Sequence, residues 1–155
     1  CGCNIVLLPQ LFGYQNDYNY FQNLASNFSS EKVLIVDTKY DSDVQQTIVS
    51  RASFLVGSRY HSIVFSVKNH VPFHAISYEH KMSSMLKELN LSEYCSVMDS
   101  PNYYLMSELT DKIFEEIFKS FCKKEKAKEE IIESEKIARK NSKKNFNLFL
   151  DKFIL

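Results

Sequence analysis

Short apolar runs, each followed by a segment with helical periodicity, constrain the fold of this chain more than any other feature. Four runs are centred on Val6, Leu34, Leu55 and Ala75, and a weaker fifth covers residues 94–98. The runs lack the apolar–polar alternation of a half-exposed strand, so each predicts a strand buried on both faces. Strands alternating with helices of about ten residues are typical of βαβ units. We therefore predict a doubly wound, Rossmann-like parallel sheet of about five strands with helices on both faces.

The segments between the runs carry helix start and stop signals. Asp17 is predicted to cap the first helix, Asp41 or Ser42 to open the second, and Asn90 to stop the fourth. Apolar residues recur at helical spacing in each segment. In the first helix they are Tyr20, Phe21, Leu24 and Phe28.

The sequence changes character after Ser107. An amphipathic helix is predicted first, and then a segment in which Lys and Glu alternate at helical spacing, which favours a solvated helix over a nucleic-acid-binding arm. We place a Rossmann-like domain at residues 1–122 and a charged helix with an apolar tail at residues 123–155. The tail residues expected to pack on this domain or on a neighbouring one are Phe146, Leu148, Phe149, Leu150 and Phe153.

Charge and cysteine usage exclude several classes of protein. Nineteen basic and nineteen acidic side chains cancel, so no overall field attracts the molecule to nucleic acid or anionic lipid. No apolar run reaches the roughly 18 residues that span a bilayer. The cysteines form no CxxC pair and no zinc-ligand set, which favours reduced thiols and a cytoplasmic location. These cysteines are Cys1, Cys3, Cys95 and Cys122.

The stretch "FLVGSRYHSIVF" places candidate functional residues where a strand becomes a helix. In a doubly wound sheet, ligands bind at the carboxyl ends of the strands. Gly57 and Ser58 let an anion approach the N–H groups of the helix start, and Arg59 can bind a phosphate or carboxylate with two donors. His61, in the first helical turn, can donate a proton. The residues therefore indicate an anion site with a candidate acid.

A purely structural interpretation of this stretch stays open. In it Arg59 caps a loop and His61 lies tucked against the sheet. His70 and His74 are more typical of packed histidines. His80 follows the next strand, so it is a candidate for the same cleft as His61.

The order and spacing of these motifs resemble the polysaccharide pyruvyl transferase family. "GSRYH", an apolar helix, the "VP" strand and the "SYEHK" turn resemble the C-terminal half of its members, and "VLLPQLFGY" resembles the Pro-Gln loop that opens their second domain. The resemblance covers roughly residues 4–100.

The resemblance implies a GT-B-like enzyme that transfers pyruvate from phosphoenolpyruvate to a sugar of a cell-surface polysaccharide as a ketal. It pairs Arg59 and His61 with phosphoenolpyruvate, His61 as the proton donor. Tyr78 and Lys81 match the "SY…K" turn and are expected, with His80, to bind the donor substrate. No cofactor and no metal is implied.

The resemblance also implies partners. They are phosphoenolpyruvate, a saccharide acceptor and an N-terminal domain of the same protein that faces this one across a cleft. Cys1 stands where an initiator Met is expected, so we interpret the chain as the C-terminal part of a longer protein, inactive alone. A cytoplasmic enzyme, free or peripheral at the inner face of the membrane, is expected.

Two other functions remain open from the sequence. A GT-B glycosyltransferase would hold the diphosphate of a nucleotide-sugar with the same strand-end arginine and helix start. A non-catalytic domain would serve assembly of a polysaccharide-synthesising complex through its charged helix and Phe-rich tail.

Overall fold

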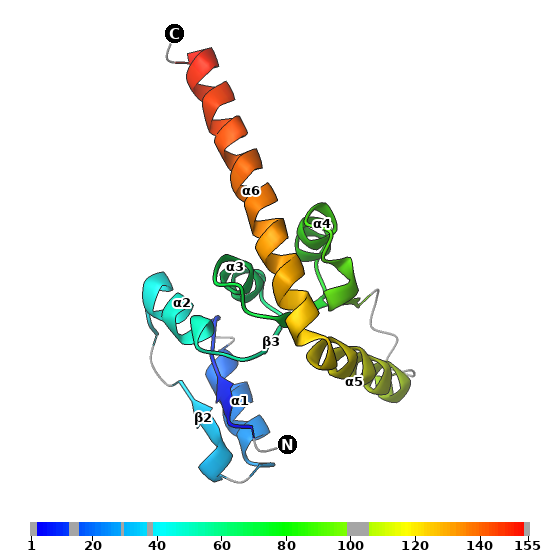
Figure 1. Ribbon diagram of the computed structural model, residues 1–155. Helices are drawn as coiled ribbons and strands as arrows, with labels where there is room; N and C mark the ends of the chain where they lie inside the picture. Colours follow the sequence, from blue (N-terminus) through cyan, green and yellow to red (C-terminus); the bar gives the residue numbers. More distant parts are fainter. Residues whose placement is uncertain (1–2, 13–15, 29, 37–38, 99–105, 154–155) are drawn as a thin grey trace. The chain divides into compact units, whose positions relative to one another are not determined.

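The chain forms two compact units, unit 1 with residues 1–45 and unit 2 with residues 46–155. A computed structural model (Figure 1) describes residues 3–12, 16–28, 30–36, 39–98 and 106–153.

Unit 1 pairs two parallel strands next to a helix. Val6 lies opposite Leu34 in the sheet, so both predicted strand centres are confirmed. The helix packs against the second strand. The elements are β1 (Ile5–Leu7), α1 (Asp17–Ala25), a 3₁₀ turn (Ser30–Lys32) and β2 (Val33–Ile35).

The cap of α1 differs from the prediction. The side chain of Asn16 accepts a hydrogen bond of 2.7 Å from the Tyr18 N–H and caps the helix. Asp17 instead accepts from the N–H groups of Gln10 and Leu11, at 3.0 and 2.9 Å, and so holds the loop that follows β1. Asp17 is the first residue of α1, and Asn16 before it takes the cap position.

The predicted burial of unit 1 was wrong in part. Val6 and Leu34 are 49% and 62% exposed, because β1 and β2 pair with each other as a sheet of two strands. Phe28 lies beyond the end of α1 at Ala25, and Tyr20 is exposed. Two strands and α1 offer too little surface to enclose these side chains.

Unit 2 contains a parallel three-stranded sheet in the order β3-β4-β5. The parallel α/β class is thus confirmed, with the predicted five strands divided between two small sheets. Ala75 is the centre of its strand as predicted, whereas Leu55 begins its strand. Helix α2 (Ser42–Ser50) spans the boundary between the two units, and its N-terminal N–H groups bond to Asp41. The elements after it are β3 (Leu55–Gly57), α3 (Tyr60–Lys68), β4 (Phe73–Ser77), α4 (His80–Glu88), a 3₁₀ turn (Ser92–Tyr94), β5 (Cys95–Val97), α5 (Met106–Cys122) and α6 (Lys124–Phe153).

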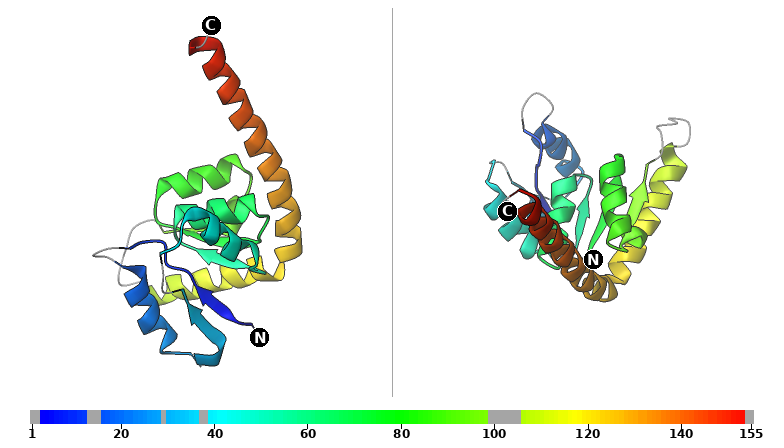
Figure 2. Two further views of the ribbon diagram at one scale, coloured as in Figure 1. Left: turned by 90° about the vertical axis from the view of Figure 1, so that its left-hand side faces the viewer. Right: turned by 90° about the horizontal axis from the view of Figure 1, so that it is seen from above.

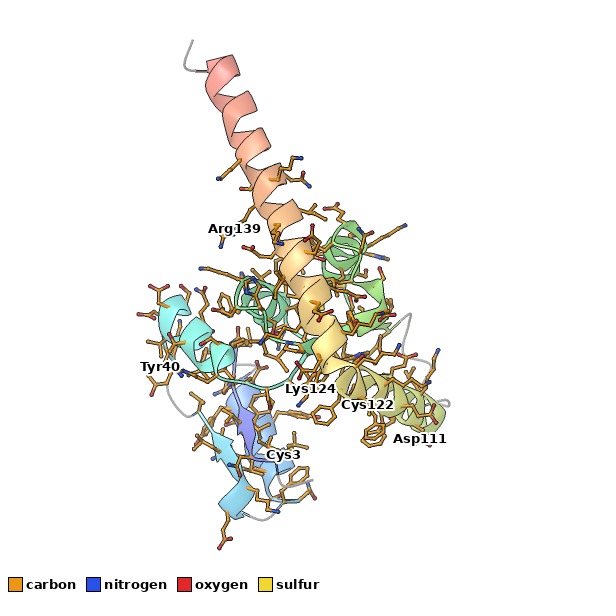
Figure 3. The ribbon with its side chains drawn as sticks, viewed as in Figure 1. Cys3, Tyr40, Asp111, Cys122, Lys124 and Arg139 are labelled. Atoms are coloured by element: carbon orange, nitrogen blue, oxygen red, sulfur yellow. The ribbon has the colours of Figure 1, made fainter. Side chains whose placement is uncertain are left out.

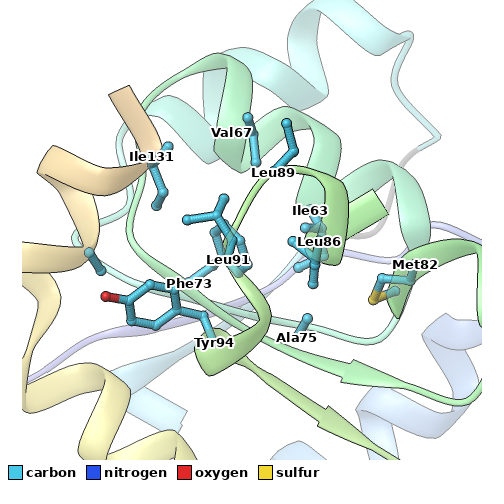
Figure 4. Close-up of a cluster of buried hydrophobic side chains, with 11 residues drawn as sticks. Ile63, Val67, Phe73, Ala75, Met82, Leu86, Leu89, Leu91, Tyr94 and Ile131 are labelled. Carbon is cyan, nitrogen blue, oxygen red and sulfur yellow. The ribbon is translucent and has the colours of Figure 1, made fainter. Parts of the chain in front are cut away.

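Helices pack on both faces of β4, the central strand of this sheet, whereas Val56 of β3 and Val97 of β5 are 50% and 48% exposed. Phe73 and Ala75 are fully buried on one face, in a cluster with side chains of α3, α4 and α6 (Figure 4). Successive side chains of a strand point to opposite faces, and His74 lies between them in sequence and bonds to Ser120 of α5. The cluster comprises Ile63, Val67, Phe73, Ala75, Met82, Leu86, Leu89, Leu91, Tyr94, Ala127 and Ile131.

Helices α3 and α4 end in the same way. His70 and Asn90 have φ angles of 55° and 58°, in the left-handed region. The next residues, Val71 and Leu91, donate their N–H groups back to Ser66 and Leu86 at 2.9 and 2.8 Å. These are Schellman motifs, in which the residue after the left-handed one is buried. The predicted stop at Asn90 is confirmed, and His70 has the same role after α3.

The last two helices are long, and the C-terminal half of α6 extends past the rest of unit 2 in Figure 1 and in the left view of Figure 2. The predicted i,i+4 pairs of its charged segment are present: Lys126 contacts Glu130 at 3.1 Å, and Arg139 contacts Glu135 (Arg139 is labelled in Figure 3). Side chains of residues 144–153 lie outside the described residues, so packing of the apolar tail stays a prediction. Among the described helices, none is long and apolar enough to cross a membrane.

Candidate functional site

The candidate residues lie at the carboxyl ends of two neighbouring strands. Gly57 is the last residue of β3, and Arg59 is the N-cap residue of α3. Ser77 is the last residue of β4, and Glu79 is the N-cap residue of α4. Because β3 and β4 are parallel and adjacent, with Gly57 opposite Ala75, both strand-to-helix junctions lie at the same edge of the sheet, as predicted.

Gly57 is required by the packing of α3. A Cβ atom at this position would lie 2.5 Å from Ser62 Oγ and 2.9 Å from Ile63 Cδ1. Ser62 cannot move freely, because its hydroxyl donates a hydrogen bond of 2.6 Å to the Arg59 carbonyl. The glycine therefore lets the first turn of α3 approach the end of β3, which fixes the backbone that carries Arg59.

A hydrogen bond joins the two junctions. Arg59 Nη1 donates to the hydroxyl of Tyr78 over 3.0 Å. Arg59 is half-buried, and its side chain makes no capping bond to α3. Tyr78 is 49% exposed. The tyrosine oxygen is a neutral acceptor that orients one N–H of the guanidinium.

A second contact connects the same junctions, with the cation on the α4 side and the tyrosine on the α3 side. The ammonium of Lys81, in the first turn of α4, lies 4.2 Å from the centre of the Tyr60 ring, in the first turn of α3. Lys81 is exposed and Tyr60 is half-buried. Two cations and two tyrosines thus alternate across the junctions.

His61 is exposed, in the first turn of α3. Its ring lies edge-on to the Tyr60 ring, with centroids 5.8 Å apart and planes at 86°. The structural interpretation, in which His61 lies tucked against the sheet, is therefore wrong for this residue. Ser58 and His80 are also exposed, and His80 begins α4. Whether His80 shares a cleft with His61 stays a prediction.

Residues 4–80, about half of the chain, match the family model for polysaccharide pyruvyl transferase. The chain belongs to this family. The match includes Arg59, His61 and Tyr78 and ends one residue before Lys81, so it is shorter than the stretch to about residue 100 that the sequence indicated. Comparisons with curated proteins and with solved structures give no match.

Sequence reasoning missed two residues of this candidate site. Tyr60 was not predicted to contact Lys81, although an aromatic residue directly between Arg59 and His61 was a visible signal. Ser77 is fully buried at the end of β4, and its hydroxyl donates to the Glu79 carbonyl at 2.8 Å. This bond shapes the turn that carries Tyr78.

His70 and His74 lie away from the candidate site. His74 is buried, and its ring nitrogens bond to Ser120 and Ser96, both at 2.8 Å. Ser96 in turn donates to Glu116. Burial lowers the pKa of His74, and the charge of Glu116 partly opposes that shift. His70 lies 3.9 Å from the Glu135 carboxylate. His74 is thus packed, as predicted, whereas the His70 side chain is 39% exposed.

Proposed function

We propose that this pyruvyl transferase takes pyruvate from phosphoenolpyruvate and attaches it as a ketal to a sugar of a cell-surface polysaccharide. The single observation that carries this proposal is that two side-chain contacts connect the strand-to-helix junctions at the ends of β3 and β4. There Arg59 and Lys81 are each held by a tyrosine of the other junction, beside an exposed histidine.

The chemistry of the donor suits such a site. Phosphoenolpyruvate carries a phosphate and a carboxylate on neighbouring carbons, so it needs several cationic or N–H donors close together. A guanidinium binds either group with two parallel bonds. The N-terminus of α3 adds unpaired N–H groups and the positive end of a helix dipole.

His61 is proposed as the general acid. A proton goes to the methylene carbon of the enol, which becomes the methyl group. One sugar hydroxyl attacks the adjacent carbon, the phosphate leaves with the C–O bonding electrons, and a second hydroxyl closes the ketal. The hydroxyls release two protons, of which one replaces the proton given by His61 and the other leaves with phosphate.

The acceptor is proposed to bind mainly through a further domain of the same protein that faces these junctions. Cations at the carboxyl ends of β3 and β4 then hold the donor, and the sugar approaches from the facing side. A ligand site between two α/β domains is a common arrangement for enzymes of this general kind.

The test is a comparison of two variants. Arg59→Ala is expected to weaken phosphoenolpyruvate binding about 10- to 100-fold, because it removes a charge-assisted hydrogen bond. His61→Ala is expected to leave binding nearly unchanged and to lower phosphate release about 10²- to 10⁴-fold, because it removes a proton donor. Binding is measured by calorimetry, and turnover by phosphate release with a polysaccharide acceptor.

Arg51→Ala is the matched control, since Arg51 is an exposed arginine in the turn before β3. It should change neither quantity. Wild-type binding and rates in both site variants would refute the assignment. Binding of a nucleotide-sugar without binding of phosphoenolpyruvate would instead support the glycosyltransferase alternative.

A further inference from the structure

Tyr60 lies directly beneath a cation that belongs to the other junction. The 4.2 Å from Lys81 Nζ to its ring centre is well within the range of a cation–π contact. The Tyr60 side chain also packs against the core cluster. The ring is therefore held by the core, while the lysine above it is exposed.

An aromatic ring and a carboxylate affect a lysine differently. Lys126 on α6 lies 3.2 Å from Glu93 and 3.1 Å from Glu130, so its charge is compensated by two carboxylates. The Tyr60 ring attracts the ammonium but carries no net charge. Lys81 is thus restrained and still has its full positive charge to offer an anion.

We infer that Tyr60 is a positioning residue that holds Lys81 for one anionic group of the ligand while Tyr78 orients Arg59 for the other. This inference rests on the proposed function and makes it more specific. The ligand class is a small molecule with two separate anionic groups, held by two cations from neighbouring strand ends. Without the ring, the flexible lysine side chain samples many rotamers and loses its fixed place.

A set of four variants tests the inference by calorimetric titration with phosphoenolpyruvate. Lys81→Met is expected to weaken binding about tenfold, the loss typical of a charged hydrogen bond. Tyr60→Leu is expected to weaken it about three- to tenfold. Tyr60→Phe keeps the ring face and should stay within about twofold of wild type. In the double variant Tyr60→Leu with Lys81→Met, affinity should equal that of Lys81→Met alone, because Tyr60 acts through Lys81.

A second measurement needs no ligand. Lysines of the protein are reductively methylated with ¹³C, and the Lys81 signal is identified by its absence in Lys81→Arg. A ring above or below a methyl group shifts its NMR signal upfield. That shift is expected in wild type and Tyr60→Phe and should disappear in Tyr60→Leu, whose fold is checked by thermal unfolding.

The outcomes separate the inference from the proposed function. Wild type that does not bind phosphoenolpyruvate refutes the proposed function and, with it, the ligand role given to the pair. Wild-type binding with unchanged affinity in Tyr60→Leu overturns the inference alone. A further loss of affinity from Tyr60→Leu in the Lys81→Met background, or a Lys81 signal without an upfield shift, also overturns it.

Discussion

The strands β1 and β2 of unit 1 and the central strand β4 of unit 2 begin from the same kind of apolar sequence, yet they differ in burial. Val6 and Leu34, at the centres of β1 and β2, are 49% and 62% exposed, whereas Phe73 and Ala75 of β4 are 0% exposed. The difference lies in what covers each sheet. β4 has a strand on each side and helices on both faces, while β1 and β2 pair with each other. An apolar run therefore predicts a strand, and the surrounding elements decide its burial.

Matched leucine variants give the largest expected effect and test the comparison directly. Leu86→Ala should lower the free energy of unfolding of unit 2 by about 2–5 kcal/mol, because it opens a cavity in a fully buried cluster. Leu34→Ala should change the stability of unit 1 by at most about 0.5 kcal/mol, as is usual at exposed positions. Amide hydrogen exchange measures each unit separately. An equal loss in both variants would show that β2 is covered in solution, and the comparison would fail.

The sequence predicted strands well because a continuous apolar run has few other uses in a short segment. Five strand positions and the helix stop at Asn90 were predicted from local patterns alone. The division of the strands into two sheets was not predicted, because strand pairing depends on contacts between distant segments. The cap of α1 was missed for a similar reason: whether Asp17 bonds its own helix or the loop at Gln10 depends on how that loop folds.

A second prediction concerns the face of the unit 2 sheet that α5 covers. Ser96→Ala removes the oxygen that accepts from His74 and should lower the stability of unit 2 by about 1–3 kcal/mol, because a buried ring nitrogen loses its partner. Ser92→Ala, at an exposed position of the preceding 3₁₀ turn, is the control and should have little effect. Urea unfolding measures both. If Ser96→Ala left the stability unchanged, water would reach His74 on the α5 face of the sheet. That face would then be exposed like the sheet of unit 1, unlike the opposite face of the unit 2 sheet.

The candidate site was partly visible in the sequence. Arg59 and Tyr78 could be placed at neighbouring strand ends because the carboxyl ends of adjacent parallel strands share an edge. The hydrogen bond between Arg59 and Tyr78 and the contact between Lys81 and Tyr60 could not be predicted. Side chains about twenty positions apart meet only when both helix starts are fixed in space. Burial of His74 was predicted from its strand, but its partner Ser120 lies on a helix that the sequence could not assign to that face.

The smallest expected effect is a pH dependence that unit 1 should lack. Ser96 donates to Glu116, so its oxygen accepts from the Nε2–H of His74. Burial lowers the pKa of His74, which favours the neutral ring in the folded protein, and in that form Nδ1 accepts from the Ser120 hydroxyl. In the unfolded chain a histidine has an ordinary pKa of about 6.5. Below that pH the unfolded state binds more protons than the folded state.

The stabilisation from a neutral His74 is thus fully present above about pH 6.5 and is lost as the pH falls below it. One proton changes the free energy of unfolding by at most about 1.4 kcal/mol per pH unit. Urea unfolding of unit 2 between pH 7.5 and 5.5, compared with His74→Gln, isolates this contribution, because glutamine does not titrate. His61→Gln leaves the buried network intact and serves as the control for the substitution itself. A His74→Gln profile as steep as wild type would show that Glu116 holds a proton on the ring in the folded state, so that this face of the sheet encloses an ion pair.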